Sequence, residues 1–191
     1  MKTAIAAVLA AAVLAGCESS TGPNVSSVLS YQVDSERERS VWLTREGVVI
    51  HSAAARPVAI ALPGWIYAGA PHCPPDLAVG PKGEVVVTSN VLQTLWRIAP
   101  ETLAVTVHPL ALDADMDKDV GFAAVIYSAD QAAFIAYSGV QRSIWKIDPA
   151  LQTGTKLARA ELREPQRSRS AINRPCAELS RRLTHLASSI D

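Results

Sequence analysis

The chain has 191 residues, of which 49% are hydrophobic, and its 18 basic residues balance 18 acidic ones to give a formal net charge of zero. This length suits one domain once a targeting segment is removed, and a balanced charge gives no overall field that would attract nucleic acid. Val, Ile, Thr and Trp are concentrated in the middle of the sequence, which favours a folded all-β body over a disordered one.

The first 16 residues have the organisation of an export signal. Lys2 supplies a positive charge, and residues 4–15 are an uninterrupted apolar run. That run is shorter than the ~20 residues of a membrane-spanning helix. A short basic start, an apolar centre and small residues before a processing point are typical of a secretory signal. We therefore expect residues 1–16 to be a signal peptide.

The signal ends in Leu14-Ala15-Gly16-Cys17, which resembles the lipobox of bacterial lipoproteins. The resemblance implies that Cys17 becomes the acylated mature N-terminus, with several acyl chains, palmitate among them, holding the protein on a membrane. Glu18 follows the cysteine in place of Asp, so family analogy places the anchor in the outer membrane, facing the periplasm, rather than in the inner membrane. An ordinary cleaved signal with a chance cysteine is the alternative. Residues 17–27 are polar and predict a flexible tether.

From residue 28 to residue 162, short apolar stretches alternate with turn signals, which predicts a series of short β-strands. Gly47 and Gly83 mark two of the turns between them. The expected strands are residues 28–33, 41–43, 48–50, 58–62, 77–79, 85–88, 95–98, 104–107, 123–126, 133–137, 143–147 and 156–158.

One sequence element recurs within this body. Thr94–Ile98 (TLWRI) returns as Ser143–Ile147 (SIWKI) and, more loosely, as Ser40–Thr44 (SVWLT). Trp96 and Trp145 are 49 residues apart, and Trp42 lies 54 residues before Trp96. Four short antiparallel strands in such an interval match the size of one β-propeller blade. We predict that the tryptophans pack the repeats together.

The repeats also carry family-like motifs. Gly83–Val87 (GEVVV) and Trp145–Pro149 (WKIDP) resemble repeat motifs of the NHL, YVTN and SMP-30-like β-propeller families, over roughly residues 31–162. The resemblance implies about three propeller-like four-stranded repeats. Closed propellers have four or more blades, so three alternatives stay open. Two chains complete one ring as a homodimer, the repeats form an incomplete β-propeller, or they are a twisted stack of sheets and not blades.

Residues 163–191 differ in character from the repeats. They begin with an Arg-rich linker, and from Pro175 onward apolar residues recur every three or four positions, at Cys176, Leu179, Leu183, Leu186 and Ile190. This spacing predicts a short amphipathic α-helix that packs back on the sheets, with Arg181 and Arg182 on its outer side. Pro175 suits the first turn of such a helix.

The cysteines suggest a second covalent link. If Cys17 is acylated, Cys73 and Cys176 remain as a pair in an oxidising compartment. A disulfide between them would tie the terminal helix to the connector between the first two repeats. Two separately buried thiols are the alternative.

Four carboxylates alternate at Asp113, Asp115, Asp117 and Asp119. The alternation is similar to the start of a calcium loop, because Ca²⁺ prefers several oxygen ligands. Lys118 then occupies the place of the EF-hand glycine, and Ala124 that of its bidentate glutamate. We favour a solvated loop and expect no resident cofactor, with Ca²⁺ as the ion to test.

These observations favour a lipid-anchored, non-enzymatic protein of the bacterial cell envelope whose repeats bind an envelope protein or a small ligand. The sequence contains no serine-elbow motif and no phosphate-binding loop. Two alternatives stay open: a metal-dependent lactonase-like hydrolase, and a degenerate, truncated propeller. The Glu, Asn and Asp ligands of the SMP-30-like family are not matched by Glu18 and Asn90, so that activity does not transfer.

Overall fold

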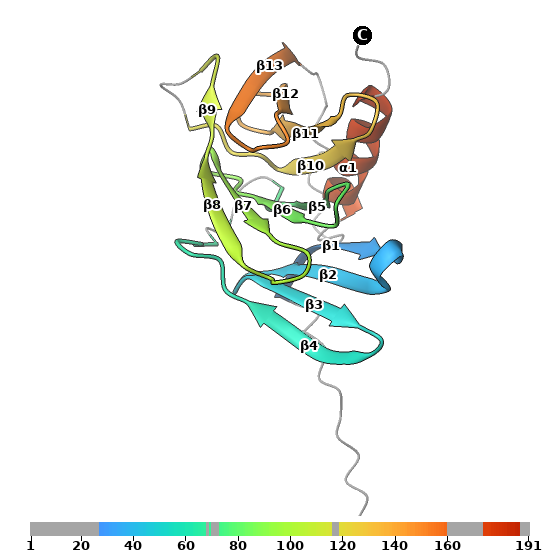
Figure 1. Cartoon of the computed structure of the whole chain (residues 1–191). Coiled ribbons are helices and arrows are strands. Elements are labelled where there is room, and N and C mark those ends of the chain that lie inside the picture. Colours follow the sequence, from blue (N-terminus) through green and yellow to red (C-terminus); the bar gives the residue numbers. More distant parts are fainter. Residues whose placement is uncertain (1–26, 68, 70–72, 116–118, 160–173, 188–191) are drawn as a thin grey trace, which may run out of the picture.

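The computed structural model describes residues 27–67, 69, 73–115, 119–159 and 174–187 (Figure 1). These residues form thirteen β-strands, one short 3₁₀ helix and one α-helix. The predicted signal peptide, Cys17, most of the tether, Asp117 and the Arg-rich linker lie outside the described residues. In the described part, no helix is long and apolar enough to span a membrane.

The strands form three separate sheets. The first is antiparallel, in the order β1 (Val28–Asp34), β2 (Arg39–Thr44), β3 (Val48–Ser52) and β4 (Ala55–Ile60), with η2 (Ser35–Arg37) between β1 and β2. The second repeats this meander with β5 (Leu77–Val79), β6 (Val85–Thr88), β7 (Thr94–Ile98) and β8 (Val105–Pro109). The third contains β10 (Ala124–Ser128), β11 (Ala133–Ser138), β12 (Ser143–Ile147) and β13 (Thr153–Arg159), with β9 (Ala111–Leu112) added parallel to β13.

The sheets lie face to face, with β5 between β1 and β10 (Figure 1). The second sheet is apolar on both sides because both sides are covered. Leu77, Val87 and Trp96 pack with the first sheet, whereas Val86 and Leu95 pack with the third. A strand that is covered on both sides carries apolar residues at successive positions, which explains the sequence Val85–Val87. Fully burying one such side chain stabilises the fold by about 1.5–3 kcal/mol.

The α-helix α1 (Arg174–Ala187) covers the free side of the third sheet. Leu179, Leu183 and Ala187 are buried there against side chains that include Ile135 and Tyr137. Arg181 and Arg182 face outward. The predicted amphipathic helix that packs back on the sheets is therefore confirmed, and it occupies the side on which a fourth sheet would otherwise pack.

Two details differ from the prediction. The third sheet has five strands rather than four, because β9 pairs with the edge of β13. The three tryptophans are also not equivalent. Trp96 and Trp145 lie on the third strand of their sheets, whereas Trp42 lies on the second strand, opposite Tyr31 and Val49. The prediction that Ser40–Thr44 is structurally equivalent to the other two segments was therefore wrong.

Candidate functional site

Five segments meet at one end of the stack, which we call the loop end. Strand direction alternates within each sheet, so the β2–β3, β6–β7 and β11–β12 turns lie at the same end as the connectors that lead into β5 and β10. Hydrogen bonds join these segments: the Trp65 indole donates to the Arg45 carbonyl at 3.0 Å, and the Asn90 amide donates to the Cys73 carbonyl at 3.2 Å. These bonds tie the β2–β3 and β6–β7 turns to the connector that leads into β5.

Large apolar side chains are exposed at the loop end. Ile66 is 80% exposed, Val140 is 55%, Leu92 is 51% and Val91 is 38%. Single exposed hydrophobic residues are common, but a group of them at one end of a domain is typical of an interaction site. These residues come from the β4–β5 connector and from the β6–β7 and β11–β12 turns.

The turn that carries Leu92 is held in shape by its neighbours. The Ser89 hydroxyl accepts hydrogen bonds from the backbone N–H groups of Val91 and Leu92, at 3.2 and 3.0 Å. Gly121 approaches the same turn so closely that a Cβ there would lie 2.0 Å from the carbonyl carbon of Asn90. Only glycine permits that approach. The apolar side chains therefore project from a fixed backbone.

The connector after β4 is also well anchored. The Trp96 indole donates to the Pro63 carbonyl at 2.8 Å, and Trp65 packs edge-to-face on Trp96 with ring centroids 5.2 Å apart. The Arg45 guanidinium lies 5.4 Å from the centre of the Tyr67 ring. Ile66 stands exposed between these two fixed aromatic residues.

Two aspartates of the acidic segment, Asp113 and Asp115, are engaged by β13. Asp113 accepts a hydrogen bond from the Lys156 backbone N–H at 2.9 Å, and the Asp115 carboxylate pairs with the Lys156 ammonium group. Asp119 is exposed, and Asp117 lies outside the described residues. Within the described ranges, no group of three or more His, Cys, Asp or Glu residues could hold a metal ion. Two of the four predicted calcium ligands thus already have protein partners.

Cys73 lies in the connector that leads into β5, where it is buried and disulfide-bonded. It packs in the same cluster as Leu179 and Leu183 of α1. The side chain of Cys176 in α1 lies outside the described ones, so the bridge from Cys73 to Cys176 stays a prediction. The packing of α1 beside Cys73 is compatible with that pairing.

Asp76 is a buried acid that the sequence interpretation did not single out. Its carboxylate accepts hydrogen bonds from the Ser30 hydroxyl at 2.5 Å and from the Val125 backbone N–H at 3.1 Å. Its backbone carbonyl accepts from the Thr88 hydroxyl at 3.1 Å. Asp76 thereby connects the first strand of all three sheets. Donors from the first and third sheets hold this carboxylate, so it serves to connect the sheets.

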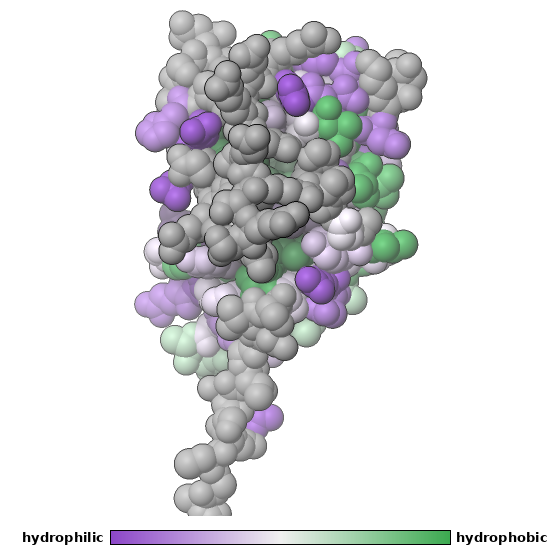
Figure 2. Space-filling view, turned by 180° about the vertical axis from the view of Figure 1, so that it is seen from behind, coloured by the Kyte–Doolittle hydropathy of each residue, from purple (hydrophilic) through white to green (hydrophobic). Residues whose placement is uncertain are grey.

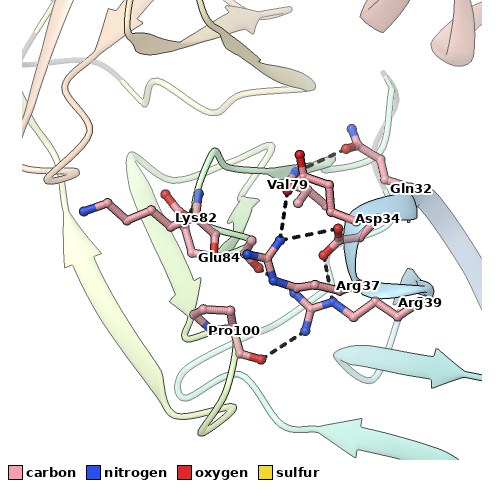
Figure 3. Close-up of polar contacts among 10 residues, drawn as sticks. Gln32, Asp34, Arg37, Arg39, Val79, Lys82, Glu84 and Pro100 are labelled. Carbon is pink, nitrogen blue, oxygen red and sulfur yellow. Dashed lines mark hydrogen bonds and ion pairs between the residues drawn. The ribbon is translucent and has the colours of Figure 1, made fainter. Parts of the chain in front are cut away.

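A second buried charge cluster joins the first two sheets at the opposite end (Figure 3). Arg39 pairs with Asp34 at 2.9 Å and donates to the carbonyls of Gly83 at 2.5 Å and Pro100 at 3.1 Å. Arg37 donates to the Lys82 carbonyl at 2.8 Å. The Arg39 guanidinium is directed at groups of both sheets, so the cluster serves to hold them together.

The aspartate of the Trp145–Pro149 motif caps a turn. Asp148 accepts hydrogen bonds from the N–H groups of Ala150 and Gln152, at 2.8 and 2.9 Å, and from the Thr153 hydroxyl at 2.9 Å. Partial burial alone would raise the pKa of Asp148, but these hydrogen bonds outweigh it and hold the pKa below its ordinary value. The carboxylate is therefore ionised and poorly suited to general acid–base catalysis near neutral pH.

The nearby His108 is shifted in the same direction. Burial, and next the positive charge of Arg97, lower the pKa of His108, which Asp148 only partly offsets. His108 is thus neutral at pH 7, and its Nε2 lies 2.8 Å from the Thr106 hydroxyl.

The sequence matches no protein-family model and none of the curated proteins. Among solved structures, a catalytically inactive virginiamycin B lyase from Staphylococcus aureus with quinupristin aligns with 71% of this chain at a TM-score of 0.55 and 14% identity. A streptogramin B lyase aligns with 68% at a TM-score of 0.52 and 15% identity. An extracellular domain assigned to a hybrid two-component system of B. thetaiotaomicron aligns with 70% at a TM-score of 0.50 and 9% identity.

The fold is that of an incomplete β-propeller. The three sheets are its blades, and the predicted all-β architecture of about three propeller-like repeats with a short C-terminal helix is confirmed. The chain spans 43%, 40% and 17% of these three proteins. At such low identity the likeness establishes the fold alone, and the lyase activity belongs to those proteins.

Proposed function

We propose that this chain is a lipid-anchored protein of the cell envelope that binds another envelope protein through its loop end. The observation that carries the proposal is the group of exposed apolar side chains formed by Ile66, Leu92 and Val140. Because they stand on separate turns and a connector, they fit the surface of a protein better than an enclosed small ligand, for which side chains converge on one cavity.

The charges around these residues indicate the chemistry of the partner. Charges of both signs are exposed in the loop-end segments, with Arg45 beside Glu46, Arg142 two residues after Val140, and Asp119 in the connector to β10. An apolar surface with neighbours of both signs complements a protein surface that has an apolar centre and a mixed-charge rim.

The position of the tether supports a partner close to the membrane. The Ser27 carbonyl accepts a hydrogen bond from the Arg45 backbone N–H at 3.2 Å, so the chain enters β1 at the loop end. Residues 17–27 span at most about 36–40 Å when extended. With Cys17 acylated, the loop end would be the part of the domain nearest the anchor.

Replacing Cys17 with serine tests the anchor. The serine variant cannot form the thioether to diacylglycerol, so we expect it to lose palmitate labelling and to keep its signal peptide uncleaved. The measurement is the mass of the purified chain, with metabolic palmitate labelling of the wild type and of a Cys73→Ser control. A variant that still carries acyl chains would contradict the anchoring proposal.

Placing a photo-crosslinking residue at Leu92 tests the binding surface. We expect a discrete protein adduct in intact cells, reduced severalfold by the added substitution Ile66→Asp, because an aspartate introduces an uncompensated charge into an apolar contact. The matched control places the crosslinker at Val107, which is 44% exposed on β8. Adducts with lipid only, or equal protein adducts at both positions, would exclude the loop end as a protein-binding surface.

A further inference from the structure

The side of the first sheet that faces away from the second sheet has no neighbour within the described structure, and we call it the outer face. Strand register assigns residues to it, since Trp42 lies opposite Tyr31 and Val49, Ser40 lies opposite Val33 and His51, and Val49 lies opposite Ala59. The outer face thus consists of Tyr31, Val33, Ser40, Trp42, Val49, His51 and Ala59.

The corresponding sides of the other two sheets are buried. Trp96 packs against the first sheet, and Trp145 packs against the second. On the first sheet the same side remains open, and Tyr31 is 60% exposed and Val33 65% exposed. The second and third blades thus each pack one side against the blade before them, whereas no described blade packs against that side of the first. In the space-filling view from behind, pale-green residues border the lower end of the molecule, where Figure 1 places this sheet (Figure 2).

The composition of the outer face is that of an interface. None of its seven residues is charged, whereas the solvated face of a sheet is normally polar, and the one charged residue of β4, Arg56, lies in the register shift between Ile50 and Ser52. Tyr31 stacks on Trp42 with ring centroids 5.2 Å apart, and His51 meets the edge of Trp42 at 6.0 Å. Exposed charged residues, among them Glu38 and Glu46, lie in the turns around it. An apolar, aromatic centre with a polar rim is the usual anatomy of a protein–protein contact.

We propose that the outer face binds the outer face of a second copy of this chain about a two-fold axis. Closing a ring head to tail would need the free side of the third sheet, and Leu179 and Leu183 of α1 occupy that side. Of these two sides, only the outer face is free, so two copies can pair only with outer face against outer face. Such a pair is an isologous dimer. A face without charges can contact itself without like-charge repulsion.

The polar groups of the outer face do not favour a sugar or an anion in place of a second copy. The Trp42 indole N–H is already donated to the Ser40 hydroxyl at 2.8 Å. A saccharide site needs several hydrogen-bonding side chains, and an anion needs a cation. The seven residues include no Lys or Arg for an anion, and because the Nε2 of His51 is buried, the Tyr31 hydroxyl is the main polar group left for a sugar.

The size of the outer face sets the strength of the dimer. Four strands about 4.8 Å apart, each with about five residues at about 3.3 Å, give a face of roughly 300 Å². This is less than half of the ~800 Å² per partner in a standard interface, so the dimer is weak in solution. Anchoring on one membrane, which rests on the function proposed above, would raise the effective concentration of the copies and populate it.

The test is a charge substitution at Val33, which is exposed and so tolerates a polar side chain without loss of the fold. Sedimentation of the purified full chain in mild detergent should show a concentration-dependent dimer. Val33→Glu should weaken dimerisation by about tenfold or more, because each copy then brings an uncompensated carboxylate into an apolar contact. Val107→Glu, at a valine that is 44% exposed on β8, should leave dimerisation unchanged.

A mixed experiment separates interface effects from damage to the fold. In an equimolar mixture of Val33→Glu and wild-type chains, a mixed dimer of intermediate strength should form, because it contains one uncompensated carboxylate instead of two. A chain that stays monomeric at every concentration would overturn the proposal. So would a dimer that Val33→Glu leaves intact, or a different protein bound at this face.

Discussion

Replacing Arg39 with alanine is expected to lower the unfolding free energy by about 3–5 kcal/mol, because it leaves a buried charge without its partner. Asp34 is only 4% exposed in its side chain, and Arg39 only 7%. The substitution also removes the donor to the carbonyls of Gly83 and Pro100, which belong to the second sheet. Denaturant unfolding of the wild type and the variant measures the loss.

Two variants show whether the buried charge is the cause. Arg37→Ala removes a nearby guanidinium that is 29% exposed and lies 3.6 Å from Asp34, so its cost should stay below about 1 kcal/mol. Adding Asp34→Asn to Arg39→Ala should recover part of the loss, since no unpaired charge remains. If Arg39→Ala cost no more than Arg37→Ala, the ion pair would not hold the sheets together.

Local sequence signals were sufficient to predict every described strand except β9. The second sheet shows why: Val85–Thr88 is a compact β-branched run that begins two residues after Gly83, whose φ of +81° favours glycine. Arg45-Glu46-Gly47 likewise marks the turn between β2 and β3, and Gly47 also has a positive φ. The periodicity of hydrophobic residues and the residue types of turns depend on neighbours in the sequence. They can therefore be recognised without knowledge of the fold.

Contacts between distant residues could not be predicted in this way. Arg39 lies 44 residues before Gly83 and 61 before Pro100, and nothing in Asp34–Arg39 distinguishes a buried pair from a solvated charged turn. Asp76 reaches Ser30 and Val125 across 46 and 49 residues. β9 has only two residues and forms because β13 offers an edge. Each of these features depends on how the sheets stack.

The candidate site likewise combines local features that the sequence shows with distant contacts that it does not. The acidic run at residues 113–119 was visible in the sequence, but its pairing with Lys156 required β13 to lie beside it. Ile66, Leu92 and Val140 gave no periodic signal, because each is a single apolar residue in a turn or connector. The sequence indicates these positions in one way only: large hydrophobic residues lie among Gly, Ser and Asn in segments that are expected to be solvated.

Replacing Leu183 with alanine is the second large effect that we expect, a loss of about 2–5 kcal/mol, because Leu183 is fully buried between α1 and the third sheet. The helix substitutes for a missing blade, so its apolar residues take the place of a whole sheet face. A cavity there weakens the cover over Ile135 and Tyr137, which the helix keeps from water. Denaturant unfolding gives the cost, and Glu101→Ala in an exposed turn of the second sheet should change the unfolding free energy by less than about 0.5 kcal/mol.

A local readout shows whether α1 detaches before the blades unfold. Arg181 and Arg182 are exposed on α1, and trypsin can cut there only when the helix opens. In Leu183→Ala, cleavage at these arginines should accelerate under native conditions and accelerate further on reduction, because Cys73 is disulfide-bonded in the cluster that α1 covers. If cleavage rose only in step with global unfolding, α1 would be an integral part of the third blade and not a separable cap on it.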